Sequence, residues 1–113
     1  MREFLRGAVR LHILHHVASQ EVNGAWMAEE LGRHGYKISP GTLYPALHKM
    51  EEEGLVSSRK EVRSGRAVRL YQITAAGRGA LAEERSVLAE LAREVLGGDP
   101  QAPAPPRRRP DLD

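Results

Sequence analysis

Five basic side chains gather within a short stretch of this chain, and their groups suit the binding of phosphate. Only one acid, Glu61, lies among them, so the stretch is far more positive than a chain with a formal net charge of +2 would suggest. Guanidinium and ammonium groups attract phosphate oxygens and release counterions, which makes such clusters a source of affinity for nucleic acids. A charged run is also typical of a solvated surface, so the neighbouring elements must decide. The five residues are Arg59, Lys60, Arg63, Arg66 and Arg69.

Two histidines form a second chemical pattern. His12 and His16 are four residues apart, which would place both imidazoles on one face of a helix, the spacing of paired metal ligands. No third ligand stands at a matching spacing, so we predict no metal cofactor and keep a divalent-metal sensor built on this pair as an alternative. The other interpretation is that these histidines pack, or change charge with pH, near a dimer interface.

The sequence patterns of catalysis are missing. The chain has no glycine-rich phosphate loop, no nucleophile elbow and no paired carboxylates in an apolar setting. Ser39, His34 and Glu53 have neither the order nor the spacing of a catalytic triad. The chain also contains no cysteine, which excludes disulfides and thiol chemistry. We therefore predict that the protein is not an enzyme.

A short helix with both ends marked precedes the basic stretch. Ser39 suits the N-cap, Pro40 the first helical position, and Gly54 the left-handed position that ends a helix. One face is an apolar stripe, and the other carries small, hydroxyl, aromatic and basic groups that can dock into a DNA major groove. An ordinary surface helix would show the same division. The stripe is Leu43, Leu47 and Met50, and the other side with its flanks is Gly41, Thr42, Tyr44, Pro45, His48, Lys49 and Glu52.

Two strand-like runs follow that helix. Residues 55–62 and 67–73 are separated by Arg63-Ser64-Gly65-Arg66, in which glycine permits a tight turn. The basic cluster therefore surrounds the tip of a predicted hairpin. A helix followed by a basic hairpin is the layout of a winged helix, whose wing contacts the DNA backbone or the minor groove. This placement favours the phosphate-binding interpretation of the cluster.

Three motifs in this region resemble the PadR family of bacterial transcriptional regulators. They are Ser39–Pro45 (SPGTLYP), Glu51–Val56 (EEEGLV) and Tyr71–Gly77 (YQITAAG), and the resemblance extends over residues 8–97. It implies a winged helix–turn–helix domain, a C-terminal dimerisation helix, operator DNA as the partner and modulation by an effector. The chain resembles the short-form members, which have a single C-terminal helix. It departs from the family at Asn23–Trp26, where many relatives carry a His-Gly-Tyr type sequence.

The remaining pattern predicts three further helices. Residues 3–18 carry a broad apolar face, as expected of a helix buried by both a core and a dimer contact. Residues 24–33 form a second predicted helix, with Asn23 as its cap. A last helix, capped by Thr74, carries apolar residues at coiled-coil spacing, which predicts a dimer seam; packing on its own domain is the alternative. The seam residues are Leu81, Leu88, Leu91 and Val95.

The expected fold is mainly α with a small β-hairpin (α+β), a winged helix–turn–helix with a C-terminal dimerisation helix. We place the DNA-binding domain in residues 1–74, the dimerisation helix in 75–97 and a disordered tail rich in proline and arginine in 98–113. No apolar run approaches the ~20 residues of a membrane span. A cytoplasmic protein without a membrane partner is therefore expected.

These features predict a DNA-binding transcriptional regulator, a repressor that binds a near-palindromic operator as a homodimer. A small-molecule or metal effector is considered for its release. The alternative is a winged-helix module that binds an acidic protein partner. The residues expected at DNA are Ser39, Gly41, Thr42, Tyr44, Pro45, His48, Lys49, Arg63, Ser64, Arg66 and Arg69, and those considered for an effector are Trp26, His12 and His16.

Overall fold

The computed structural model describes residues 2–97, so the tail predicted for residues 98–113 lies outside the described residues. The chain divides into two compact units, the first ending at Ala82 and the second beginning at Glu83. The elements, in order, are α1 (Glu3–Ser19), β1 (Val22–Asn23), α2 (Gly24–Arg33), α3 (Pro40–Glu52), β2 (Val56–Arg63), β3 (Arg66–Ile73) and α4 (Ala75–Leu96).

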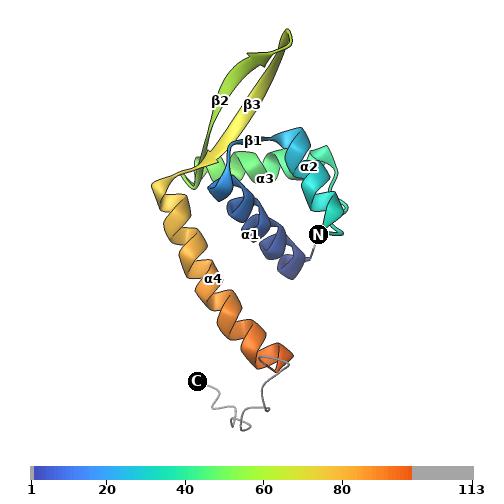
Figure 1. The fold of residues 1–113 in the computed structure, drawn as a ribbon. Coiled ribbons are helices and arrows are strands. Elements are labelled where there is room, and N and C mark those ends of the chain that lie inside the picture. The colour runs from blue at the N-terminus through green and yellow to red at the C-terminus, as the bar shows by residue number, and fades with distance from the viewer. Residues whose placement is uncertain (1, 98–113) are drawn as a thin grey trace. The chain divides into compact units, whose positions relative to one another are not determined.

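The strands form a small antiparallel sheet with the order β1-β3-β2. Arg63 pairs with Arg66, which leaves Ser64 and Gly65 as a two-residue turn with φ angles of 51° and 75°. Positive φ at both central residues is the type I′ geometry that matches the twist of a hairpin. Figure 1 shows the hairpin projecting away from α1, α2 and α3, with its turn at the far end. The two-residue β1 was not predicted, because a run this short has no periodicity to detect.

The core of the first unit is apolar and takes side chains from each of its helices. The apolar stripes that the sequence predicts are buried in this core. One side of α1 is buried, and each residue of the α3 stripe is 2 % exposed or less. Burial of each large aliphatic side chain contributes about 1.5–3 kcal/mol, so these stripes hold α1, α2 and α3 together. The core residues are Val9, Ile13, Leu14, Val17, Val22, Met27, Leu31, Leu43, Leu47, Met50, Val56, Tyr71 and Leu81.

The helix caps follow the sequence with one difference. Oδ1 of Asn23 accepts a hydrogen bond from the N–H of Trp26 at 2.7 Å, and Gly54 has a φ of 79°, both as expected. Ser39 occupies the N-cap position of α3, but its hydroxyl makes no capping hydrogen bond and lies 3.4 Å from Oγ1 of Thr42. Its carbonyl oxygen instead accepts from the N–H groups of Thr42 and Leu43.

The first turns of α4 belong to the winged unit. Oγ1 of Thr74 accepts from the N–H of Gly77 at 2.9 Å and donates to the carbonyl oxygen of Gly54 at 2.6 Å. These bonds tie the start of α4 to the end of α3. Leu81 is 4 % exposed within a single chain, which corrects its assignment to the dimer seam. Its side chain is already used by the core, since the winged unit runs to Ala82 instead of stopping before α4.

Candidate nucleic-acid interface

α3 presents an exposed polar face. The residues predicted for DNA contact on this helix are all exposed, while the apolar stripe behind them is buried. The helix runs unbroken through Pro45, which has no N–H to offer the carbonyl of Gly41. His48 has an acid close by, since its Nε2 lies 3.4 Å from Oε2 of Glu52. The outer face of α3 is therefore polar, partly cationic and accessible.

Tyr44 serves the fold as well as the surface. A Cβ atom at Gly24 would lie 2.5 Å from Cε1 of Tyr44, so the ring rests on the start of α2. Its side chain remains 46 % exposed. Tyr44 thus fixes α2 against α3 with one side of its ring and leaves the rest for a partner. The sequence alone did not reveal this contact, because Gly24 and Tyr44 are far apart in the chain.

Thr42 and Lys49 lie on the side of α3 that faces α1. Both line a groove of about 170 Å³ together with Arg6, Val9 and Glu53. The bottom of the groove is apolar and its rim is charged, so α1 and α3 jointly shape this edge of the candidate interface. The predicted effector residue Trp26 is not part of this groove; it is half-buried and packs against the core.

The fold rearranges the charges of the basic hairpin. Arg59 forms a bidentate pair with Glu21, at 3.0 and 2.8 Å, and also contacts Glu61. Hydrogen bonds from Arg63 and then from Arg59 hold the pKa of Glu61 below its usual value. Arg59 and Arg63 are therefore engaged with acids. Glu61 stands beside these arginines in the sequence, whereas Glu21 is 38 residues from Arg59 and comes beside the sheet only because the next residues pair with β3 as β1.

The other basic residues of the hairpin are less constrained. Arg69 donates to Oγ of Ser58 at 2.9 Å, and Ser58 donates to Oε2 of Glu51 at 2.8 Å, which links the hairpin to α3. Lys60 and Arg66 are exposed and form no ion pair with any of residues 2–97. Ser64 lies in the turn itself and is exposed. The cationic groups that remain open to a partner therefore lie toward the tip of the hairpin.

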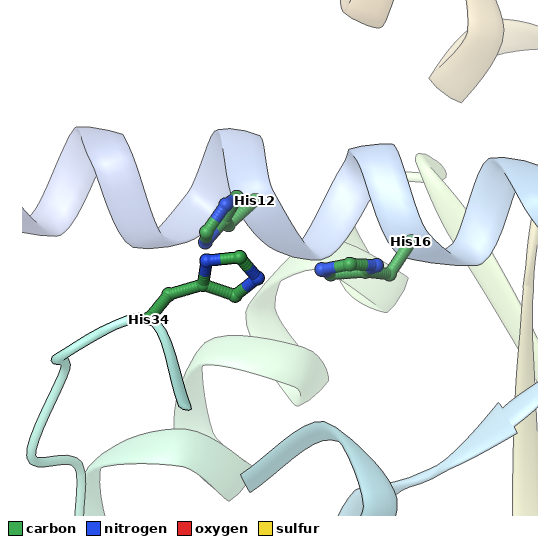
Figure 2. Close-up of side chains that lie close together, drawn as sticks. All are labelled: His12, His16 and His34. Atoms are coloured by element: carbon green, nitrogen blue, oxygen red, sulfur yellow. The ribbon is translucent and has the colours of Figure 1, made fainter. Parts of the chain in front are cut away.

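Three histidines meet beside α1. Figure 2 shows His12 and His16 on the same side of α1, with His34 approaching from the segment that follows α2. One ring nitrogen from each of the three lies within 4.8 Å of the others. The rings of His12 and His34 have centroids 4.7 Å apart. The spacing of His12 and His16 predicted that they share a face of the helix, but no signal in the sequence brings His34 to them.

Burial disfavours the charged form of two of these histidines. Burial lowers the pKa of His12 and of His16, and the charge of His34 adds to the lowering at His12. Glu30 lies beside the cluster, with Oε2 3.1 Å from Nε2 of His34 and 3.6 Å from Nε2 of His16. Desolvation opposes ionisation of Glu30, but its hydrogen bond with His34 nonetheless holds its pKa below the usual value. Trp26 flanks the group, with its ring 5.4 Å from that of His16.

A buried helix stripe behind an exposed polar face, followed by a hairpin with a basic tip, defines a winged helix–turn–helix transcriptional regulator. The family model described as "Transcriptional regulator PadR-like family" matches residues 13–83. The chain belongs to this family, which confirms the resemblance of its motifs. The family and the relatives are transcriptional regulators and not enzymes. Within residues 2–97, no helix combines the length and apolar character that crossing a membrane requires.

Similar proteins support the assignment along most of the chain. Transcriptional regulator Rv3488 of Mycobacterium tuberculosis is 64 % identical over 98 residues, which cover 87 % of this chain and 92 % of the relative. Transcriptional regulator TA0346 from Thermoplasma acidophilum has a similar structure, with a TM-score of 0.76 at 28 % identity over 84 % of this chain and 92 % of that one. A PadR-like regulator from Bacillus cereus gives a TM-score of 0.72 at 28 % identity, covering 87 % of this chain and 100 % of its own.

Proposed function

We propose that the protein is a homodimeric repressor that places α3 of each protomer in the major groove of operator DNA. The observation that carries the proposal is the outer face of α3, where Gly41, Thr42 and Pro45 are small and exposed while Leu43 and Leu47 anchor the helix from behind. A rigid helix with a low, polar outer surface can approach base edges closely. Membership in a family of transcriptional regulators supports this use of the face.

The wing has the electrostatics of a backbone contact in this proposal. Lys60 and Arg66 are exposed and form no ion pair with the described residues, so their charges are available to phosphates. Arg63 and Arg69 contribute more weakly, because Glu61 and Ser58 already engage them. The wing then supplies affinity that does not depend on base sequence, while α3 supplies discrimination.

Dimerisation is assigned to the part of α4 that lies in the second unit. Exposed apolar side chains gather there, with exposed fractions from 44 % for Leu91 to 77 % for Leu96. A helix end of this composition is stabilised when a second copy covers it. A two-fold dimer would present two α3 helices to half-sites about one helical turn apart, so the operator is expected to be near-palindromic. The exposed residues are Val87, Leu88, Leu91, Val95 and Leu96.

In this proposal an effector acts on the winged unit or on the dimer itself, because the described residues considered for its binding belong to the winged unit. Two kinds are considered: a small apolar molecule near Trp26, and a divalent ion at the histidines. Either kind regulates only if it binds the free and the DNA-bound protein with different affinities.

Replacing Arg66 by alanine tests the wing. We expect weaker binding to all DNA sequences and a slope of log K against log salt that is shallower by about 0.9, the value for one phosphate contact. The measurement is binding of the protein to its own promoter at several salt concentrations. Arg93→Ala is the matched control, because Arg93 pairs with Glu90 on α4, outside both proposed DNA surfaces. An unchanged slope in Arg66→Ala would remove the wing from the interface.

Replacing Thr42 by alanine tests α3. Thr42 lies in the first turn of the helix, where winged and related regulators reach base edges. The expected result is a change of about 1–3 kcal/mol in discrimination between operator and mutated operator, with the salt slope retained. Competition binding with single-base operator variants measures it. If Thr42→Ala lowers affinity for every sequence equally, the residue contacts the backbone instead.

A further inference from the structure

We propose that His12, His16 and His34 form a binding site for a divalent transition-metal ion, with Glu30 orienting His34. Because this proposal names the effector of the regulator, its regulatory part rests on the proposed function. The ion-binding part does not, since it depends only on side chains of the winged unit. Zn²⁺ and Co²⁺ are the ions of choice, because imidazole nitrogen suits both.

The ligand atoms are already assembled. The three ring nitrogens lie within 4.8 Å of one another, and a small contraction would bring each to the ~2.1 Å at which imidazole binds zinc. His12 and His16 come from successive turns of α1, so the backbone holds both at a constant separation. His34 comes from the C-cap of α2, where the φ of 92° at Gly35 turns the chain away from the helix. α1 and the end of α2 thus bring the three imidazoles close together (Figure 2).

Two of the three histidines also have a buried ring nitrogen without a hydrogen bond within residues 2–97. Nδ1 of His12 and Nε2 of His16 are buried and have no hydrogen-bond partner among the described residues. Buried polar atoms are almost always paired, because leaving one without a partner costs about 1–3 kcal/mol. Ordinary packing of aromatic rings does not account for two such atoms on successive turns of one helix. An ion bound between the rings would coordinate nitrogens that the protein leaves unsatisfied.

Glu30 acts through His34. Its Oε2 accepts a hydrogen bond from the Nε2 side of the His34 ring at 3.1 Å, while Oε1 lies 3.7 Å from Nε of Arg33. A carboxylate that accepts the N–H of a ligating imidazole fixes the tautomer and leaves the other ring nitrogen for the metal. Glu30 is therefore a positioning residue, and it supplies a negative charge that partly offsets that of the ion.

The place of the site in the fold connects it with α3. His34 begins the segment that leads through Ile38 to the start of α3, whereas His12 and His16 belong to α1. An ion shared by the three would hold this connecting segment against α1. The position of α3 would then depend on whether the site is filled. Binding of the ion is thereby coupled to the affinity for operator DNA.

Titration of the metal-free protein with Zn²⁺ tests the site. We expect one ion per chain by calorimetry, a rise in thermal stability with Zn²⁺ concentration and, with Co²⁺, a visible absorption band typical of nitrogen ligation. Trp26, the chain's single tryptophan, lies 5.4 Å from the His16 ring and should lose fluorescence when Co²⁺ binds. His34→Ala and His16→Ala should abolish the Co²⁺ band and weaken Zn²⁺ binding at least about tenfold.

Two further variants make the test specific. His15→Ala removes an exposed imidazole next to the cluster and should leave Zn²⁺ stoichiometry and affinity unchanged. Glu30→Gln should keep one ion per chain but lower the affinity by about 10- to 100-fold, as loss of an orienting partner does. Retained binding in His34→Ala, or binding lost equally in His15→Ala, would overturn the site. Circular dichroism of each variant checks that it is folded.

Promoter binding with Zn²⁺ and with chelator separates the two proposals. We expect Zn²⁺ to change the affinity for promoter DNA by at least about fivefold, and His34→Ala to lose that response while still binding DNA. Metal binding without any change in DNA affinity would overturn the effector role alone. A protein that binds Zn²⁺ at the three histidines but never binds its promoter would instead overturn the proposed function and leave the site standing.

Discussion

Replacing Leu88 by aspartate should yield a monomer that has lost most of its affinity for operator DNA. Leu88 is 47 % exposed on α4 and lies in the second unit, among the apolar residues assigned to the dimer seam. A carboxylate in an apolar seam loses hydration without gaining a partner, and two-fold symmetry would bring two such charges together. A monomer contacts one half-site only, so operator affinity should fall by roughly 10²–10⁴.

Sedimentation at micromolar concentration and operator binding measure the two effects. Ser86→Asp is the matched control, because at ~100° per residue Ser86 lies on the opposite side of α4 from Leu88. The winged domain of Leu88→Asp should keep its thermal stability, since its core does not include this residue. A wild-type protein that sediments as a monomer would refute the proposed dimer, whatever the variant does.

Replacing Gly77 by alanine should destabilise the winged domain strongly. Gly77 is buried in the first turn of α4, and a Cβ atom there would lie only 2.6 Å from Cγ1 of Ile73 and closer still to the carbonyl oxygen of Leu55. The nearest obstacle is backbone, which cannot rotate away as a side chain can. Overpacking of this kind costs about 1–3 kcal/mol, and we expect the upper end of that range. Thermal and denaturant unfolding measure it.

Gly79→Ala provides the control, because Gly79 is exposed on the same helix and a Cβ there would meet nothing within 4 Å. Alanine is the better helix former, so this variant should be more stable by about 0.5–1 kcal/mol. Opposite signs for two identical substitutions two positions apart would show that the close approach of α4 to the start of β2 is the cause. Equal effects would mean that α4 can move away from Leu55.

Short motifs in the sequence were enough to predict the helices and the hairpin of this fold. Ser39 and Pro40 mark the start of α3, Gly54 marks its end, and Ser64 and Gly65 supply the two positive φ values of the hairpin turn. Each of these features depends on residues within a few positions of each other, where backbone sterics and capping decide the structure. The same holds for the buried and exposed faces of α3, which follow from helical periodicity alone.

The residues predicted to contact DNA are accordingly found on accessible surface, but their contacts with DNA stay predictions. The seam on α4 also stays a prediction, now without Leu81. That residue shares its heptad spacing with Leu88, and periodicity cannot distinguish a partner in the same chain from one in another copy. Leu81 packs in the core of the winged unit, so its partner is in the same chain.

The amino-acid sequence by itself determined the helices, the hairpin, the family and the division of α3 into an inner and an outer face, because each rests on periodicity or on short motifs. Only the tertiary structure brought Glu21 to Arg59, the ring of Tyr44 to Gly24, and His34 to His12 and His16. Each of these contacts joins residues that are distant in the chain. Their chemistry depends on how α1, α2 and the sheet pack, and no spacing along the sequence encodes that packing.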